Sequence, residues 1–230
     1  MRTVTPLFAA MGAAVLAVGC AVSPAAPNDR DDSPIARCSG PACSKVATPV
    51  AWPDVRLADG TTPFNVQGAY TIQLPGAPLE FILNGDNGFI ARYADRRWIG
   101  VQVLHAASIG VARKDGASDT RPGALALADM PRILYTKTPA DTEPTLAEDR
   151  DLWRLALAFK NGTFENATQL NVAERGPLVA YFADGGVGDT TGEIHVVHRR
   201  TRDAYLFVQL KGFSFDDVRR IVGSIEARKP

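Results

Sequence analysis

The chain has 230 residues, of which 46% are hydrophobic and 22% are charged, and its 25 basic residues balance 25 acidic ones. A protein that binds nucleic acid normally carries a basic excess or a basic stripe. The charge balance therefore argues against a nucleic-acid partner, and the hydrophobic fraction suffices for a folded domain with its own core.

An apolar run from Pro6 to Val18 follows the basic start Met1-Arg2-Thr3. It is shorter than the roughly 20 apolar residues that a membrane-spanning helix needs, so it indicates a signal peptide at residues 1–19. Its end, Ala17-Val18-Gly19-Cys20, resembles the lipobox of bacterial lipoproteins. The resemblance implies a lipid on Cys20 and, because Ala21 rather than an aspartate follows, a place on the periplasmic face of the outer membrane. An ordinary secretory signal or a buried helix is the alternative.

Residues 20–62 are rich in proline and show no helical or strand period, so the sequence predicts an extended tether. Within it, Cys38 and Cys43 bracket a Gly-Pro turn and could close a small disulfide in an oxidising envelope. A redox pair would usually be the tighter C-x-x-C, and a zinc site would need further Cys or His ligands nearby. We therefore favour the structural disulfide.

Residues 63–230 are predicted to form a single domain that begins with a hairpin. Apolar and polar residues alternate over 70–74 and 79–83, as in half-buried strands. The turn sequence Asn84-Gly-Asp-Asn-Gly88 then leads into a further strand at 89–93. Residues 98–104 are apolar on both faces, which is typical of a central strand covered by helices on both sides.

Two helical segments are predicted next. Residues 121–135 are rich in helix formers, although Pro131 should kink or end the first turns. Thr145 and Glu148 have the spacing of a capping box that opens a second helix, which we expect to stop at Asn161-Gly162. The apolar stripe of this second helix comprises Leu152, Leu155, Ala156 and Phe159.

Four strands and a last helix complete the predicted domain. The strands are expected at 168–173, 178–182, 193–198 and 204–210. Ser214 is the expected N-cap of the helix, with Asp216 and Asp217 near the positive end of its dipole. Its core-facing stripe is Phe215, Val218, Val222 and Ile225.

This order of elements, with the terminal run Asp-Asp-Val-Arg-Arg-Ile-Val-Gly-Ser-Ile at 216–225, resembles the PsbP-like α/β/α sandwich of small bacterial lipoproteins and envelope proteins. The resemblance covers residues 65–228. It implies an α+β fold, in which helices cover an antiparallel sheet, and a binding or adaptor role. It assigns no functional residues, because no motif matches residue by residue.

Two patterns could be metal sites, but their spacing argues against it. His195 and His198 lie three apart on a predicted strand and therefore point to opposite faces. The loop Asp184–Glu193 has three carboxylates and four glycines, yet it fits neither the EF-hand spacing nor the repeated glycine-rich calcium pattern. We expect no metal and interpret the loop as a flexible hairpin turn.

No catalytic constellation or cofactor motif is recognisable. His105 lies near Ser108, but no G-x-S-x-G elbow accompanies them. Paired carboxylates for sugar cleavage depend on spatial rather than sequence spacing, so they stay open. We therefore expect a protein without enzymatic activity.

The sequence thus predicts a lipid-anchored envelope protein that binds another protein, either an immunity protein against a secreted toxin or an assembly factor. The expected contact loops are 84–88 and 184–193, because loops on a rigid scaffold usually carry recognition. Their candidate contact residues are Asp86, Asn87, Asp184, Asp189 and Glu193. The alternatives are a hydrolase built from His105, His195 and loop carboxylates, and a small-ligand carrier with a pocket between sheet and helices.

Overall fold

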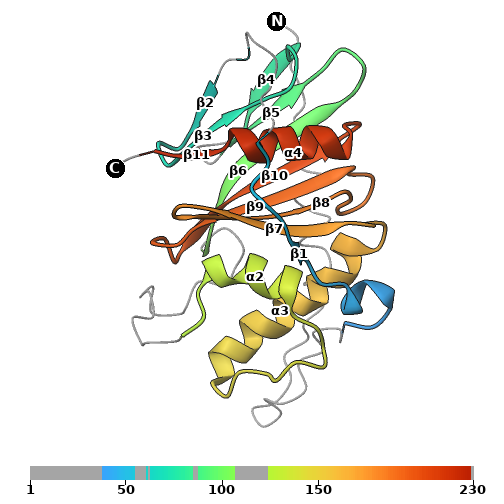
Figure 1. The fold of residues 1–230 in the computed structure, drawn as a ribbon, viewed down its shortest axis with the longest axis vertical. Helices are drawn as coiled ribbons and strands as arrows, with labels where there is room; N and C mark the ends of the chain where they lie inside the picture. Colours follow the sequence, from blue (N-terminus) through green and yellow to red (C-terminus); the bar gives the residue numbers. More distant parts are fainter. Residues whose placement is uncertain (1–37, 55–60, 62, 85–87, 107–123, 229–230) are drawn as a thin grey trace, which may run out of the picture. The chain divides into compact units, whose positions relative to one another are not determined.

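The protein is built on a large sheet of eight strands (Figure 1). The computed structural model describes residues 38–54, 61, 63–84, 88–106 and 124–228, all within one compact unit, Ile35–Pro230. The strands are β1 (Thr48–Pro49), β4 (Glu80–Leu83), β5 (Gly88–Arg92), β6 (Trp98–His105), β7 (Leu170–Arg175), β8 (Leu178–Ala183), β9 (Gly192–His198) and β10 (Ala204–Lys211). Their order in the sheet is β1-β7-β8-β9-β10-β6-β5-β4, and only the β1–β7 pair is parallel.

The first face of the sheet carries a helix and a second, smaller sheet. The helix is α4 (Phe215–Ser224), and the three-stranded sheet has the order β11 (Glu226–Ala227), β3 (Tyr70–Gln73) and β2 (Pro63–Val66). Val218, Ile221 and Val222 of α4 are completely buried against alternate residues of the large sheet. The helix lies directly on β9, because a Cβ added at Gly192 would come within 2.4 Å of the Val218 side chain.

The second face carries two helices, α2 (Met130–Thr136) and α3 (Ala147–Phe164). They pack on the intervening residues of the same strands, such as Tyr181 and Tyr205. Helices therefore cover both faces, which explains why the central strands are apolar on both sides. The predicted α+β class, an antiparallel sheet covered by helices, is confirmed.

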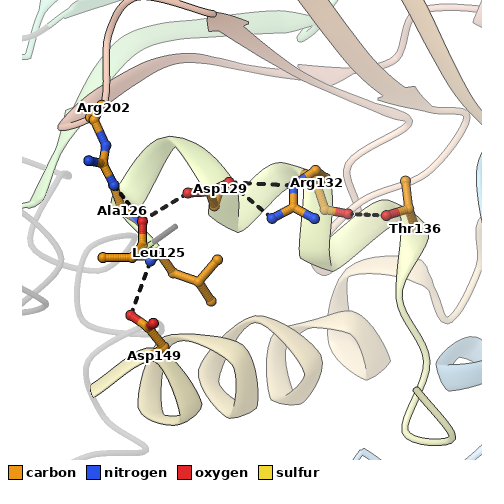
Figure 2. Close-up of polar contacts among 8 residues, drawn as sticks. Leu125, Ala126, Asp129, Arg132, Thr136, Asp149 and Arg202 are labelled. Carbon is orange, nitrogen blue, oxygen red and sulfur yellow. Dashed lines mark hydrogen bonds and ion pairs between the residues drawn. The ribbon is translucent and has the colours of Figure 1, made fainter. Parts of the chain in front are cut away.

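Helix α2 begins later than the sequence suggested, and Pro131 lies in its first turn instead of kinking it. A short 3₁₀ turn, η3 (Leu127–Asp129), precedes it. Figure 2 shows the polar contacts that hold the segment before α2. Asp129 accepts from the backbone N–H of Ala126 at 3.0 Å, and Asp149 of α3 accepts from the backbone N–H of Leu125, also at 3.0 Å. Proline has no N–H to lose at a helix start, so this position costs little.

Helix α3 differs from its prediction at both ends. Leu146 is its N-cap and no side chain caps it, so the capping box expected from Thr145 and Glu148 is wrong. The helix continues through Gly162 to Phe164, because Thr163 and Phe164 are buried in the second-face core. Its buried stripe comprises Leu152, Trp153, Ala156, Leu157, Lys160, Thr163 and Phe164, and Phe159 is 36% exposed.

Helix α4 begins as predicted. Ser214 Oγ accepts from the backbone N–H of Asp217 at 3.2 Å, and the Asp217 carboxylate accepts in return from the backbone N–H of Ser214 at 3.1 Å. This reciprocal capping box satisfies two backbone donors at once. The sequence predicts the Ser214 N-cap and the acidic first turn, which are local signals, but not the return contact of Asp217.

Residues 38–54, predicted to belong to a tether, pack on the domain instead; we name them the strap. They contain the 3₁₀ turn η1 (Pro41–Ser44) and β1. The predicted Cys38–Cys43 disulfide is formed, Ala42 and Cys43 are only 2% and 4% exposed, and Ala42 packs into the core on the second face. A tether can therefore extend no further than residue 37 before the fold begins.

The strap runs alongside β7, with which β1 pairs in parallel, and it contacts the end of α3 on the second face. Lys45 Nζ donates to the carbonyl oxygens of Phe164 at 2.7 Å and Ala167 at 2.6 Å, which satisfies acceptors at the end of α3. At the other end, the Arg175 guanidinium lies 4.6 Å from the Trp52 ring centre and donates to the carbonyl oxygen of Gly223 in α4. The strap thus covers this edge of the sheet.

Candidate binding surface

The opposite edge strand, β4, exposes apolar side chains at alternate positions. Leu79, Phe81 and Leu83 are 72%, 44% and 80% exposed. Alternate residues of a strand share one face, and Phe81 contacts Phe64 and Phe89, which pack on the first-face core. Phe81 and Leu83 therefore share the first face of the sheet, at its edge. Leu79 precedes the strand, and its backbone N–H donates to the carbonyl oxygen of Arg92 at 2.7 Å. We name Leu79–Leu83, with its side chains and outward backbone, the β4 edge.

Phe81 is held in place by an aromatic cluster. Its ring centre lies 4.9 Å from that of Phe64, in the small sheet, and 5.7 Å from that of Phe89, in β5. Phe64 and Phe89 are themselves 5.5 Å apart. Tilted and edge-to-face contacts of this kind stabilise by about 1 kcal/mol each beyond the area they bury. The apolar surface is therefore supported by the core and needs little ordering when a partner binds.

The backbone of β4 is paired on one side only, among the described residues. The backbone N–H of Asn84 donates to the carbonyl of Gly88 at 2.9 Å, and Ile82 is opposite Ile90 in the register. Hydrogen-bonded pairs alternate along an antiparallel ladder, so Ile82 faces β5 while the N–H and C=O groups of Phe81 and Leu83 point outward. Two residues thus offer free backbone groups and exposed apolar side chains together.

Charge is placed on the other side of this strand. Glu80 pairs with Arg92 across the β4–β5 ladder at 2.7 Å, and both side chains are about half exposed. As the strand neighbour of Phe81, Glu80 faces away from the side chains of Phe81 and Leu83. The apolar face of β4 therefore carries no charged side chain of its own.

The loop at 184–193, predicted as a contact surface, uses its carboxylates within the fold. Asp184 accepts from the backbone N–H groups of Thr168 at 2.7 Å and Gln169 at 2.9 Å. Asp189 pairs with Lys211. Glu193 lies inside β9 rather than in the loop and is 3% exposed, so it cannot contact a partner at the surface. The other two predicted contact residues, Asp86 and Asn87, and the lipidation residue Cys20 lie outside the described residues.

Glu193 belongs instead to a buried polar cluster with His195. His195 Nε2 lies 3.2 Å from Glu193 Oε1, and the His195 ring centre is 5.4 Å from that of Tyr135 on α2. Tyr135 is completely buried. Burial raises the pKa of its hydroxyl well above the usual value, and the nearby Glu193 carboxylate raises this pKa further. The cluster is enclosed by the second-face core, which favours a structural role.

The histidines do not assemble a catalytic or metal site within the described residues. His105 Nε2 lies 3.1 Å from the Gln67 side-chain oxygen, whereas His195 contacts Glu193 and His198 accepts from the backbone N–H of Arg200. Ser108 lies outside those residues. No group of three His, Cys, Asp or Glu residues that could hold a metal ion occurs where the chain is described.

One shallow hollow of about 570 Å³ opens between the strap and β7. It is lined by Lys45, Val46, Thr48 and residues 167–171. Lys45 already donates to the end of α3, so its amine is engaged there. This hollow is at the covered edge, not between the sheet and the helices where a carrier pocket was predicted.

Comparison of the chain with protein-family models found no match, and comparison with curated proteins found none either. Along the stretches that the structure describes, no helix is long and apolar enough to cross a membrane. The assignment of a function therefore depends on the surface itself.

Proposed function

We propose that this protein is a lipid-anchored bacterial envelope protein that acts, without catalysis, by binding another protein through the β4 edge. The observation that carries the proposal is the exposure of Phe81 and Leu83 on a strand whose outer backbone is unpaired among the described residues. Exposed apolar clusters mark interaction sites, and free strand edges accept extended segments of partners.

The surface also has the composition of an interface core. Aromatic and aliphatic anchors at the centre of an interface, with charge kept to the rim, account for most binding energy. Phe81 is such an anchor, and Glu80 and Arg92 form a neutral pair beside it. An immunity protein that blocks a secreted toxin and an envelope assembly factor both fit this chemistry.

The lipid anchor is proposed from the lipobox-like end Ala17–Cys20. Because the strap begins at Cys38, only residues 21–37 separate the proposed lipid from the fold. Seventeen residues reach at most about 60 Å when fully extended. The β4 edge would therefore act on partners in or near the membrane.

The binding proposal is tested by capture from envelope extract, with residues 20–230 carrying Cys20→Ser as bait. Leu83→Lys places a charge on the β4 edge, and Val187→Lys places one on the 184–193 loop, where Val187 is 44% exposed. We expect one stoichiometric partner that is lost with Leu83→Lys and kept with Val187→Lys. A partner that survives Leu83→Lys, or is lost only with Val187→Lys, would contradict the assignment to β4.

The anchor is tested separately by cell fractionation and by mass spectrometry of the mature amino terminus. We expect the wild-type chain in the membrane fraction with a lipid mass on Cys20. The Cys20→Ser chain should lose that mass and leave the membrane fraction. A wild-type chain without lipid would overturn the anchor and leave the binding surface untouched.

A further inference from the structure

The β4 edge is complementary to itself. In an antiparallel pairing of two β4 strands centred on Ile82, Phe81 of one copy lies opposite Leu83 of the other, and Leu83 lies opposite Phe81. These are the residues whose backbone groups point outward, so both pairs would form ladder hydrogen bonds. Ile82 would form the non-hydrogen-bonded pair on the twofold axis between them. In this register the outward N–H and C=O groups of Phe81 and Leu83 therefore face the matching groups of the second copy.

The charges around β4 permit the same pairing. Glu80 would lie opposite Asn84 of the second copy rather than opposite another carboxylate. Glu80 is also neutralised by Arg92 of its own chain at 2.7 Å. The strand Glu80–Leu83 contains neither the lysine nor the proline that commonly prevents edge-to-edge association. No feature of this strand opposes a second copy.

We propose that the β4 edge pairs with the β4 edge of a second copy of this chain, which joins two eight-stranded sheets into one continuous sheet around a twofold axis at Ile82. The inference rests on the proposed function in one respect, that β4 is the binding edge, and at that edge a second copy would compete with another protein. It commits to one occupant, a second copy held by four backbone hydrogen bonds and by the side chains of Phe81 and Leu83 from both copies.

The area of the surface sets the strength of this dimer. Phe81 and Leu83 offer roughly 230 Å² per copy, taking about 180–200 Å² for a whole Leu or Phe residue. The total of roughly 460 Å² is well below the approximately 1,200 Å² of a stable interface, so the dimer is weak in solution. Two copies anchored in one membrane would meet at a higher effective concentration. A weak interface is therefore sufficient for an anchored protein.

Sedimentation velocity over a wide range of protein concentration measures the association. The sample is residues 20–230 with Cys20→Ser, at about 10 µM to 1 mM. We expect a reversible shift toward twice the monomer mass across this range. Leu83→Lys should remain monomeric, and Val187→Lys should dimerise like the parent protein.

Cysteine cross-linking tests the register. Across a non-hydrogen-bonded pair the two Cα atoms lie about 4.5 Å apart, within the span of a disulfide. Ile82→Cys should therefore give a disulfide-linked dimer under mild oxidation. Glu80→Cys is the matched control, because its two copies would lie about 13 Å apart in this register.

The outcomes separate this inference from the proposed function. Reversible dimerisation abolished by Leu83→Lys, with cross-linking at residue 82 in preference to residue 80, supports the inference. A monomer at every concentration overturns it, as does a dimer that Leu83→Lys leaves intact or that cross-links equally at residues 80 and 82. If the monomer still captures another protein in a Leu83-dependent way, the second copy is excluded as occupant and the binding function stands.

Discussion

The two edges of the large sheet are treated differently by the same chain. At one edge the strap pairs with β7 and donates to the end of α3, whereas at β4 the outer backbone is unpaired among the described residues and Leu83 is 80% exposed. A free edge is a template for another strand. The strap covers the edge beside β7, whereas the edge at β4 carries exposed apolar side chains. We therefore propose β4, and not the covered edge at β7, as the site of association.

Removal of the strap should give the largest effect. Deleting residues 20–54 would uncover the core around Phe164 and leave the end of α3 uncapped, so we expect a loss of at least about 4 kcal/mol in the free energy of unfolding. Urea unfolding followed by tryptophan fluorescence measures it. Deleting residues 20–34, which precede the compact unit, is the control and should change little. Equal stability of the two deletions would show that the strap is only a tether.

Lys45 should account for a large part of that effect. Lys45→Met keeps the aliphatic stem but removes the donors to the carbonyls of Phe164 and Ala167, and hydrogen bonds to a charged group are worth about 1.5–3 kcal/mol. Unfolding in urea should show a loss of about 2–3 kcal/mol. Lys211→Met is the matched control, because its pair with Asp189 is exposed and should be worth less than about 1 kcal/mol. A smaller loss for Lys45 than for Lys211 would argue against the capping role.

Opening the disulfide should have an intermediate effect. The Cys38–Cys43 ring closes a short loop, so its removal by Cys38→Ser with Cys43→Ser should cost about 2 kcal/mol. Reduction of the wild-type protein should lower its thermal midpoint to that of the double variant. The double variant itself should not respond to reductant; a response there would mean that reduction acts elsewhere.

The buried amine of Lys160 should make the free energy of unfolding depend on pH. Its burial on α3 lowers the pKa to about 8, and the nearby Asp141 opposes this only in part. The unfolded chain therefore binds more protons than the folded one between pH 8 and about 10.4, and stability rises with pH there. Comparing wild type with Lys160→Met in urea at pH 7 and 9.5, we expect the wild type to gain up to about 2 kcal/mol relative to the variant. No change in that difference would contradict the lowered pKa.

The β4 edge should show the smallest effect on stability. Leu83 is mostly exposed, so Leu83→Lys should change the free energy of unfolding by no more than about 0.5 kcal/mol. The same variant should lose association. A strong destabilisation would instead assign Leu83 to the core and remove the contrast between the two edges.

Signals confined to a few neighbouring residues were readable in the sequence. The Ser214 N-cap and the alternating strands depend on local spacing, and the structure confirms both. Thr145 and Glu148 have an equally good local pattern, yet α3 starts one residue too late for it. The contacts of each segment with the core decided between the two cases, and these are not visible in a window of four residues.

The candidate binding surface could be predicted only in part from the sequence. The alternation of Leu79, Phe81 and Leu83 was recognised as a strand, but strand order decides whether that strand is central or at the edge, and strand order depends on distant segments. Composition predicts a tether for the proline-rich strap, because composition does not show that Lys45 reaches the end of α3. Glu193 was counted with its glycine-rich loop although the next strand had already begun, where His195 is its neighbour.

Amide hydrogen exchange at Phe81 and Leu83 tests the central claim, that β4 is an open edge which accepts a strand, most directly. In dilute protein the amides of Phe81 and Leu83 should exchange rapidly, while that of Ile82, inside the β4–β5 ladder, is protected. At high concentration, or with a captured partner, both outward amides should become protected. Amides at 81 and 83 that are already protected in dilute protein, or that stay fast under both conditions, would contradict the claim.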